Sequence, residues 1–459
     1  MSVSARTFVR AIILFVALSI ARSIANGQEP KLPLSAPDES STENKKSDQQ
    51  PPAPAPPAPP PDFWNQDALS GDWGGTRSKW KEKGVELDFA FTQFLQGVAS
   101  GGIDTGATGT GRFQSAFKFD LGKLAGWKFW SLDVKTETRF GGPLLGGTGT
   151  ISPVNTAAII PSASGSAFTI SSLNLTKIFP LDLQKGDLIA LSFGRFNLLD
   201  LTDEHFFGGG GIDRFWNIAQ IGPLTVLREV PFITNLVSFA YIRHGEPIFT
   251  FALLDPNDHS LNPGLKNLFA DGVTFSPGIN LPAKYFGKTA KHSLGAAVTT
   301  KRYTPFDAIR QVIIPRPPVN PVQPEGGSWS TSYTFRQYIV ERGKDDGWGF
   351  FGQVALANRS TSPISTFVNA GFGGNGLFKT RRKDEFGIAY AYTDLSEVLK
   401  NNLDPLSLRP LLPEHQGEVF YNFHITSWLR FTVDLQVIRP TRPVADIAII
   451  PGVRLEVIL

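Results

Sequence analysis

The stretch PGVRLEVIL (residues 451–459) ends the sequence and decides the fold. Its apolar side chains at positions 453, 455, 457 and 459 alternate with Arg454 and Glu456. A period of two is typical of a β-strand with one apolar and one polar face. Because the alternation runs to the final residue, we expect this strand to be paired along its length with other strands.

The same alternation recurs through the sequence, for example in VELDFAF (85–91), FQSAFKFDL (113–121) and RFTVDLQV (430–437). This alternation predicts sixteen β-strands. Beyond the N-terminal region, no apolar run is long enough to form a membrane-spanning helix. The predicted strands lie near 85–98, 112–122, 127–140, 168–178, 187–196, 232–244, 247–254, 271–280, 292–303, 331–342, 347–357, 365–375, 383–394, 416–426, 428–439 and 449–459.

The connections between these strands alternate in length. Long segments such as 141–167, 197–231 and 304–330 alternate with tight turns such as KLAG (123–126) and GKDD (343–346). An even number of strands with this alternation predicts an all-β fold, a 16-stranded antiparallel transmembrane β-barrel of the bacterial outer membrane. An unpaired strand edge is costly in hydrocarbon, so we expect the last strand to pair with the first.

The residues before the barrel divide into two segments. Arg6 and Arg10 precede the apolar run AIILFVALSI (11–20), which predicts a signal peptide over 1–25. Residues 26–62 are rich in proline and predict a disordered linker, which leaves 63–459 as the barrel domain. At its start, Thr76 is expected to cap a short helix that Gly84 ends.

Composition excludes several classes of function. Removal of residues 1–25 takes away three of the 44 Lys and Arg residues and none of the 41 Asp and Glu residues, so the remaining chain is near neutral and has no nucleic-acid signature. The absence of Cys excludes thiol chemistry and Cys-ligated metals. The six His residues are not spaced as metal ligands usually are, so we expect no metal site, no cofactor and no catalytic residues. The weaker alternative is that LDPNDHS (254–260) forms a calcium-binding loop.

The polar face of the first and last strands is charged along its length, which favours a water-filled lumen. Six basic and eight acidic side chains intermix there, an arrangement that suits neutral polyols better than ions. The alternative is that these groups are hydrated lumen residues that merely neutralise one another. The predicted pore-lining residues are Glu86, Asp88, Arg112, Lys118, Asp120, Asp133, Lys135, Glu137, Arg139, Glu418, Arg430, Asp434, Arg454 and Glu456.

Four tryptophans lie beside predicted short turns: Trp127, Trp130, Trp348 and Trp428. Indole rings favour the membrane–water interface, so these residues predict an aromatic girdle at the periplasmic rim. Stacking of these rings on a ligand is the alternative.

The long connection 197–231 is a candidate constriction loop, with an aromatic face and charged groups for a sugar. The alternative is an extracellular loop packed on its own aromatic residues. Its candidate residues are His205, Phe207, Asp213, Arg214 and Trp216. Arg195 precedes this loop, and its parity within the strand 187–196 places it on the lipid side unless a bulge intervenes.

Several blocks resemble the carbohydrate-selective porins of the OprB family. LSGDWGGTRSKWKEKGVELDFAFTQFLQGVASGG (69–102) is similar to the start of that family's barrel, and LGKLAGWKFWSL, LSFGRFNLLD and EVFYNFHITSWLRFTVDLQVIRP follow in the family's order. The resemblance covers 63–459 and implies a sixteen-stranded porin with its N-terminal segment, around Trp73 to Gly84, at the periplasmic mouth. The Pro-rich segment and Leu459, where an aromatic residue is usual, depart from the pattern.

We therefore expect passive, carbohydrate-selective diffusion of monosaccharides and similar small solutes across the bacterial outer membrane, without enzymatic activity. Expected partners are the sugars in transit, outer-membrane lipid, the barrel-assembly machinery through the C-terminal strand, and peptidoglycan through the Pro-rich linker. A general diffusion porin without sugar preference is one alternative function. A secreted soluble glycan-binding β-protein is another.

Overall fold

The computed structural model of the chain describes residues 62–142, 144, 147–159, 166–200, 213–261, 265, 267–313, 322–403 and 410–459. The expected signal peptide (1–25) and all but the last residue of the expected linker (26–62) lie outside these residues.

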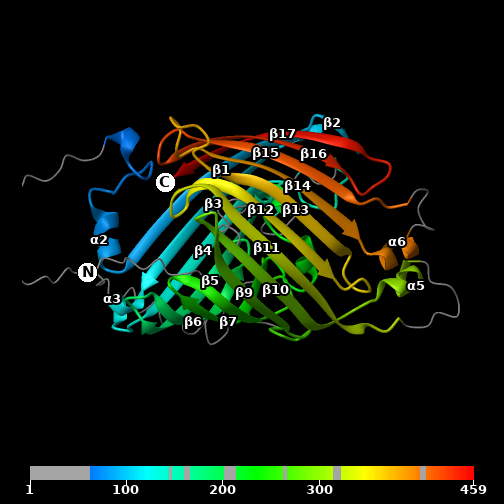
Figure 1. Cartoon of the computed structure of the whole chain (residues 1–459), viewed down its shortest axis with the longest axis horizontal. Coiled ribbons are helices and arrows are strands. Elements are labelled where there is room, and N and C mark those ends of the chain that lie inside the picture. The colour runs from blue at the N-terminus through cyan, green and yellow to red at the C-terminus, as the bar shows by residue number, and fades with distance from the viewer. Residues whose placement is uncertain are drawn as a thin grey trace, which may run out of the picture.

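A single antiparallel sheet closes on itself to form the barrel (Figure 1). Of its 17 strands, β2 (Ser100–Gly102) is a short strand beside β17, and the other sixteen form the barrel, as predicted. The sixteen are β1 (Val85–Val98), β3 (Gly106–Asp120), β4 (Trp130–Gly141), β5 (Ala167–Asp182), β6 (Asp187–Asn197), β7 (Ile233–Arg243), β8 (Glu246–Leu254), β9 (Thr274–Tyr285), β10 (Lys288–Tyr303), β11 (Glu325–Gly343), β12 (Asp346–Ala357), β13 (Ile364–Asn375), β14 (Glu385–Leu395), β15 (Glu414–His424), β16 (Leu429–Arg439) and β17 (Asp446–Ile458).

The first and last strands are hydrogen-bonded neighbours, which confirms the expected closure. β1 pairs with β17 in a register that sets Phe91 opposite Val457 and Phe94 opposite Arg454. Outside this ladder, the N–H of Leu459 donates to the carbonyl of Phe89 at 2.9 Å. The terminal strand therefore has a partner on both sides, β1 and β16.

The alternating side chains divide between the two faces of the barrel as the period of two requires. Leu95 and Leu455 lie on the outer face, where they are 56% and 41% exposed. Phe94 and Arg454 lie on the inner face and are 1% exposed. Burial inside a barrel of this size means that other parts of the chain cover these residues.

The two ends of the barrel differ (Figure 1). The short turns, helices α2 and α3 and the C-terminus lie at one end, and helices α5 and α6 lie at the other. In outer-membrane barrels the short turns are periplasmic. None of the helices in the described residues is long and apolar enough to cross a membrane. The helices are η1 (Phe63–Asn65), α2 (Thr76–Glu82), α3 (Leu121–Ala125), η2 (Thr156–Ala158), α4 (Ile218–Ile221), η3 (Leu224–Arg228), η4 (Phe306–Ala308), α5 (Ile309–Ile313) and α6 (Glu397–Leu403).

Helix α2 lies at the periplasmic rim, but Thr76 is not its cap. Thr76 is the first helical residue, and the cap position is held by Gly75 with φ 88°. The carboxylate of Asp72 instead accepts the N–H of Ser78 at 2.8 Å. Gly75 holds the cap position because the backbone there is left-handed, a conformation that glycine adopts readily and threonine disfavours. Glycine has no side chain to accept a hydrogen bond, so the carboxylate of Asp72 accepts a free N–H group of the first turn instead.

Residues 62–83 form an N-terminal clasp over the junction of β1 and β17. The guanidinium of Arg77 donates to the carbonyl of Leu87 on β1 at 2.7 Å and to that of Leu459 at 3.0 Å. The N–H of Leu69 donates to the carbonyl of Ile458 at 2.8 Å. The clasp therefore binds both strands that close the barrel.

Candidate pore constriction

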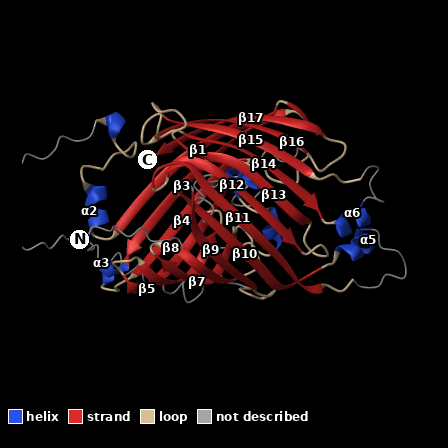
Figure 2. Ribbon diagram, in the orientation of Figure 1, coloured by secondary structure: helices blue, strands red, loops and turns tan. Residues whose placement is uncertain are grey.

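Two segments of the long connections lie inside the barrel. The first inner segment, 147–158, follows β4, and the second, 213–229, precedes β7 and contains α4 and η3. Figure 2 shows short helices within the outline of the strands. Both segments pack on inward-facing side chains of β1 and of β12 to β17, so they reduce the open part of the lumen.

Aromatic side chains hold the second inner segment against the wall. The ring of Phe215 lies 4.8 Å from that of Phe420 and 6.0 Å from that of Phe351, between centroids. The indole of Trp216 lies 5.1 Å from the ring of Phe94 on β1. Phe215 and Trp216 are fully buried, so the second inner segment is packed like a protein core.

Two glycines in the wall make room for these rings. A Cβ atom on Gly387 would lie 2.5 Å from the ring of Phe215, and one on Gly452 would lie 2.5 Å from the ring of Trp216. A glycine inside a strand often marks such a close approach. The sequence of β14 and β17 therefore specifies where the second inner segment binds.

The carboxylate of Glu418 on β15 binds the backbone of the second inner segment. It accepts the N–H of Trp216 at 2.6 Å and that of Asn217 at 3.0 Å. The amide of Asn217 donates to Gln436 on β16 at 3.1 Å, and Gln436 donates in turn to the carbonyl of Val154 at 2.9 Å. Gln436 thus connects the two inner segments.

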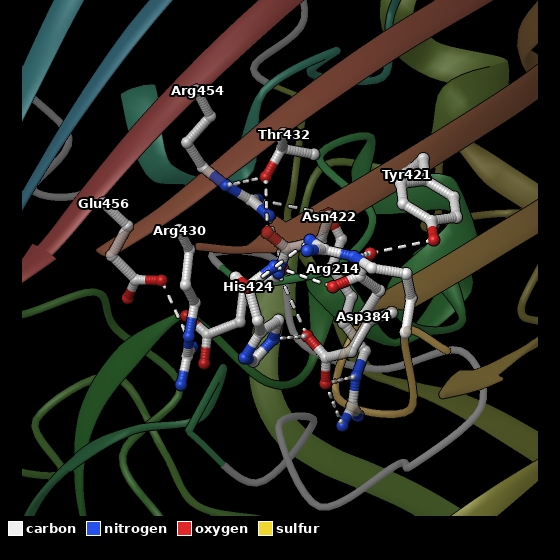
Figure 3. A network of polar contacts seen from close by, with 12 residues as sticks. Arg214, Asp384, Tyr421, Asn422, His424, Arg430, Thr432, Arg454 and Glu456 are labelled. Atoms are coloured by element: carbon white, nitrogen blue, oxygen red, sulfur yellow. Dashed lines mark hydrogen bonds and ion pairs between the residues drawn. The ribbon is translucent and has the colours of Figure 1, made fainter. Parts of the chain in front are cut away.

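A polar network binds the start of the second inner segment near the periplasmic half of β14 to β17 (Figure 3). Arg214 and Glu385 form an ion pair at 3.1 Å, and Asn422 donates to Glu385 at 3.0 Å. Arg454 donates to the carbonyls of Asp213 and Arg214. Its Nε also donates to the hydroxyl of Thr432 at 3.1 Å.

The first inner segment is held by another carboxylate on the same wall. Glu414 accepts the N–H of Ile151 at 2.9 Å and that of Ser152 at 3.3 Å. On the opposite side, Arg139 of β4 donates to the carbonyl of Ala158. Backbone groups of the segment thus find partners among charged side chains of the wall, as buried backbone requires.

The beginning of the β6–β7 connection is bound to β3 and β4 by a buried ion network. Arg112 and Glu137 lie 2.8 Å apart, and Lys135 pairs with Asp200. The amide of Asn197 donates to Glu137 at 3.1 Å. Burial raises the pKa of Asp200, and the charge of nearby Lys135 opposes that rise.

The fourteen predicted pore-lining residues fall into distinct environments. Seven are buried and bind either inner segments or other side chains of the wall: Arg112, Glu137, Arg139, Glu418, Asp434, Arg454 and Glu456. Lys135 and Arg430 have mostly buried side chains, 12% and 22% exposed. Glu86, Asp88, Lys118 and Asp133 are exposed or half-buried near the periplasmic mouth. Asp120 caps α3 by accepting the N–H groups of Gly122 and Lys123.

The candidate residues of the 197–231 loop are only partly described. His205 and Phe207 lie outside the described residues. Asp213 and Arg214 are half-buried. The side chain of Arg214 belongs to the network of Figure 3, and the carbonyl of Asp213 accepts a hydrogen bond from Arg454. The expectation that Trp216 offers an aromatic face to solutes needs correction, because its indole is fully buried between Phe94 and the notch at Gly452.

Three of the four expected girdle tryptophans are partly or largely exposed at the end of the barrel that carries the short turns. Trp127 is 50% exposed, and Trp130 and Trp348 are half-buried. Trp428 is 6% exposed because the N-terminal clasp covers it. Its indole N–H donates to the carbonyl of Phe63 at 3.1 Å.

Arg195 does not lie on the outer surface, where simple parity would put it. It is 3% exposed and donates to the carbonyls of Ile170 at 3.1 Å and His259 at 2.7 Å. A register shift in the β4–β5 pairing and φ 132° at Gly194 interrupt the regular alternation beside it. Such irregularities redirect side chains.

The loop LDPNDHS uses its carboxylates within the loop. Asp255 accepts the N–H groups of Asn257 and Phe269 and lies 3.2 Å from the imidazole of His259. Burial alone would raise the pKa of the Asp255 carboxyl. The nearby imidazole of His259 and the hydrogen bonds from these N–H groups outweigh burial, so the pKa of Asp255 is lowered. Among the described residues, no group of three His, Cys, Asp or Glu side chains could hold a metal ion.

Sequence reasoning missed several residues that build the constriction, above all Glu385, Glu414, Asn422 and Gln436. A usable signal was present, because amide and carboxylate side chains recur on the inward-facing positions of β15 and β16. Their partners lie in the two inner segments, more than a hundred residues away in the chain. Period-two patterning carries no information about such pairs.

The chain is similar to known outer-membrane porins. Residues 104–457 match the family model described as "Carbohydrate-selective porin, OprB family". Porin B of Pseudomonas aeruginosa is 22% identical over 440 residues, which cover 86% of this chain and 92% of that protein. The high-pH structure of Pseudomonas putida OprB superimposes with a TM-score of 0.72 at 18% identity, and covers 87% of this chain and 100% of that one. Its low-pH structure gives a TM-score of 0.52 at 14% identity and covers 86% and 99%.

Proposed function

The chain belongs to the OprB family of carbohydrate-selective porins, and we propose that its two inner segments set the bore through which monosaccharides and similar small solutes diffuse. It is an outer-membrane sugar channel. Its family is one of passive channels, and the contacts described above position groups by shape and hydrogen bonding. We infer that the protein has no enzymatic activity.

One observation carries this proposal: charged side chains of the wall bind the backbone of the second inner segment. Glu418 and Arg454 each make two hydrogen bonds to backbone groups of residues 213–217. Such buried, charge-assisted bonds hold a segment in one position, so the bore has a fixed width. Toward the periplasmic mouth, Glu86, Asp88, Lys118 and Asp133 supply donors and acceptors of both signs, which suits the hydroxyl groups of neutral sugars.

Liposome swelling tests this function directly. We expect vesicles that contain the full chain to swell faster in a monosaccharide series than in amino acids of similar size. Equal rates for sugars and amino acids would instead support a general diffusion porin. Mature protein that stays in solution without detergent would support the soluble glycan-binding alternative.

We also propose two protein-level partners. The C-terminal strand, whose outer face carries Val453 and Leu455, would engage the barrel-assembly machinery before it pairs with β1. The Pro-rich segment would contact peptidoglycan, and this segment lies outside the described residues. Deletion of residues 26–61 should leave swelling rates unchanged and reduce the fraction of the porin that sediments with purified peptidoglycan.

A further inference from the structure

A lysine lies on the outer face of the barrel at the periplasmic rim. Lys177 of β5 pairs with Trp130, the first residue of β4, and with Leu191 of β6. Leu191 is 37% exposed on the outer surface, and residues directly opposite each other share a face of the sheet. A cation on this face is expensive in hydrocarbon and favourable where lipid headgroups begin.

Three aromatic rings surround the ammonium group of Lys177. Its Nζ lies 5.5 Å from the ring centroids of Trp130 and Phe179 and 5.8 Å from that of Phe129. It also donates to the carbonyl of Lys128 at 2.9 Å. These contacts fix the position of the charge, since cation–π attraction is strongest where water is excluded.

The ammonium group keeps hydrogen-bonding capacity for a ligand. An ammonium has three donors, and one of them goes to Lys128. Among the described residues, no carboxylate lies within ion-pair distance of Lys177. By contrast, Lys185 in the next turn pairs with Asp182 at 2.7 Å.

Exposed apolar side chains continue the outer surface around this group. Trp127 is 50% exposed, Phe129 and Phe179 are each 43% exposed, and Leu181 is 57% exposed. Indole and phenyl rings at this level match the headgroup region of a bilayer. An anion that carries acyl chains would therefore gain apolar contacts beside the charge, whereas a free phosphate ion would gain the charge alone.

From this geometry we propose that Lys177, with the rings of Phe129, Trp130 and Phe179, forms a binding site for the phosphodiester of an anionic phospholipid in the periplasmic leaflet. The proposal rests on the membrane orientation of the proposed function. The ammonium donates to the phosphate oxygens, the rings contact the glycerol region, and the exposed apolar residues contact the acyl chains. A lipid whose own amine neutralises its phosphate binds more weakly.

Native mass spectrometry of the detergent-solubilised full chain, titrated with short-chain phosphatidylglycerol, tests the site. We expect Lys177→Met to weaken binding roughly fivefold and Lys177→Arg to keep it. The matched control is Lys185→Met, which removes an exposed lysine of the same hairpin and should bind as the parent chain does. Phosphatidylcholine and inorganic phosphate serve as further ligands, and both should bind more weakly than phosphatidylglycerol.

Two results would overturn the site: equal binding of phosphatidylglycerol by the parent and Lys177→Met, or displacement of the bound lipid by inorganic phosphate at similar concentrations. Conductance in planar bilayers, measured on the same preparations, keeps this proposal separate from the channel function. Lys177→Met should conduct normally, whereas a parent chain that forms no channel would count against the proposed function and not against the lipid site.

Discussion

At the scale of single residues, several charged side chains of the inner wall form hydrogen bonds with backbone groups of the inner segments. Glu418 is a clear case, since its carboxylate receives the N–H groups of Trp216 and Asn217 and is 2% exposed. Period-two patterning identifies Glu418 as lumen-facing. It does not reveal whether such a group meets water or another part of the chain.

Glu418→Gln should loosen the second inner segment. The amide can accept only one of the two N–H groups, and its own NH₂ then faces a donor, which costs about 2 kcal/mol. We expect a higher single-channel conductance and faster swelling in disaccharides. Glu397→Gln on α6, where the side chain is 68% exposed, should change neither rate. An unchanged conductance for Glu418→Gln would mean that the segment does not limit the bore.

At the scale of elements, strands β14 and β17 are shaped to receive the second inner segment. Gly387 and Gly452 leave space for the rings of Phe215 and Trp216, respectively. These glycines cost the strands some local stability, and the buried rings offset that cost. The fit of ring to notch therefore determines the position of residues 213–221.

Gly452→Ala should displace the ring of Trp216 from its notch. The added methyl group would overlap a rigid indole ring, and such overpacking typically costs 1–3 kcal/mol, here about 2 kcal/mol. Tryptophan fluorescence should shift to longer wavelength, and the denaturant midpoint should fall. Gly417→Ala on β15 is the control, because the nearest atom to its Cβ lies 3.8 Å away. Equal effects of the two substitutions would contradict the notch.

A buried carboxyl group at the end of the second inner segment predicts a pH dependence. Glu229 follows η3 and is 0% exposed, and burial raises its pKa despite the hydroxyls of Ser328 and Ser330. Its contribution to stability is therefore complete below the ordinary pKa of glutamate and is lost as pH rises through the raised value. We expect the segment to loosen, and conductance to rise, as pH increases through this window.

Glu229→Gln should flatten that pH profile, although the raised pKa of Asp200 leaves part of the dependence in place. The comparison is Glu397→Gln on α6, where the side chain is 68% exposed. Its conductance should follow the pH profile of the parent chain. If Glu229→Gln keeps the full profile of the parent, Glu229 is not the titrating group.

At the scale of the whole molecule, the closed sheet depends on the junction between its first and last strands. The N-terminal clasp covers that junction, with Arg77 bonded to the carbonyls of Leu87 and Leu459. Arg77 and Leu459 lie 382 positions apart in the chain. The clasp therefore stabilises the step of closure that has the greatest separation in sequence.

Arg77→Ala should weaken this junction by about 2 kcal/mol, because carbonyl groups lose a charged donor. Amide hydrogen exchange should speed up in β1 and β17 and stay unchanged in β9 and β10. Lys79→Ala removes an exposed side chain from the same helix and should leave exchange at the junction as it is. Uniformly faster exchange in every strand would indicate a general loss of stability instead.

The sequence by itself determined the barrel. Period-two alternation determines the strands and their inner and outer faces, and the alternation of long and short connections indicates an up-and-down barrel. The cost of an unpaired strand edge in lipid requires that the sheet close. All of these are local or general constraints. Only the tertiary structure decided which lumen residues meet water and which bind inner segments. Glu418 and Trp216 lie 202 positions apart, and their contact depends on how a long loop folds back into the lumen. Local patterning cannot encode such a contact, since it arises from packing between distant parts of the chain.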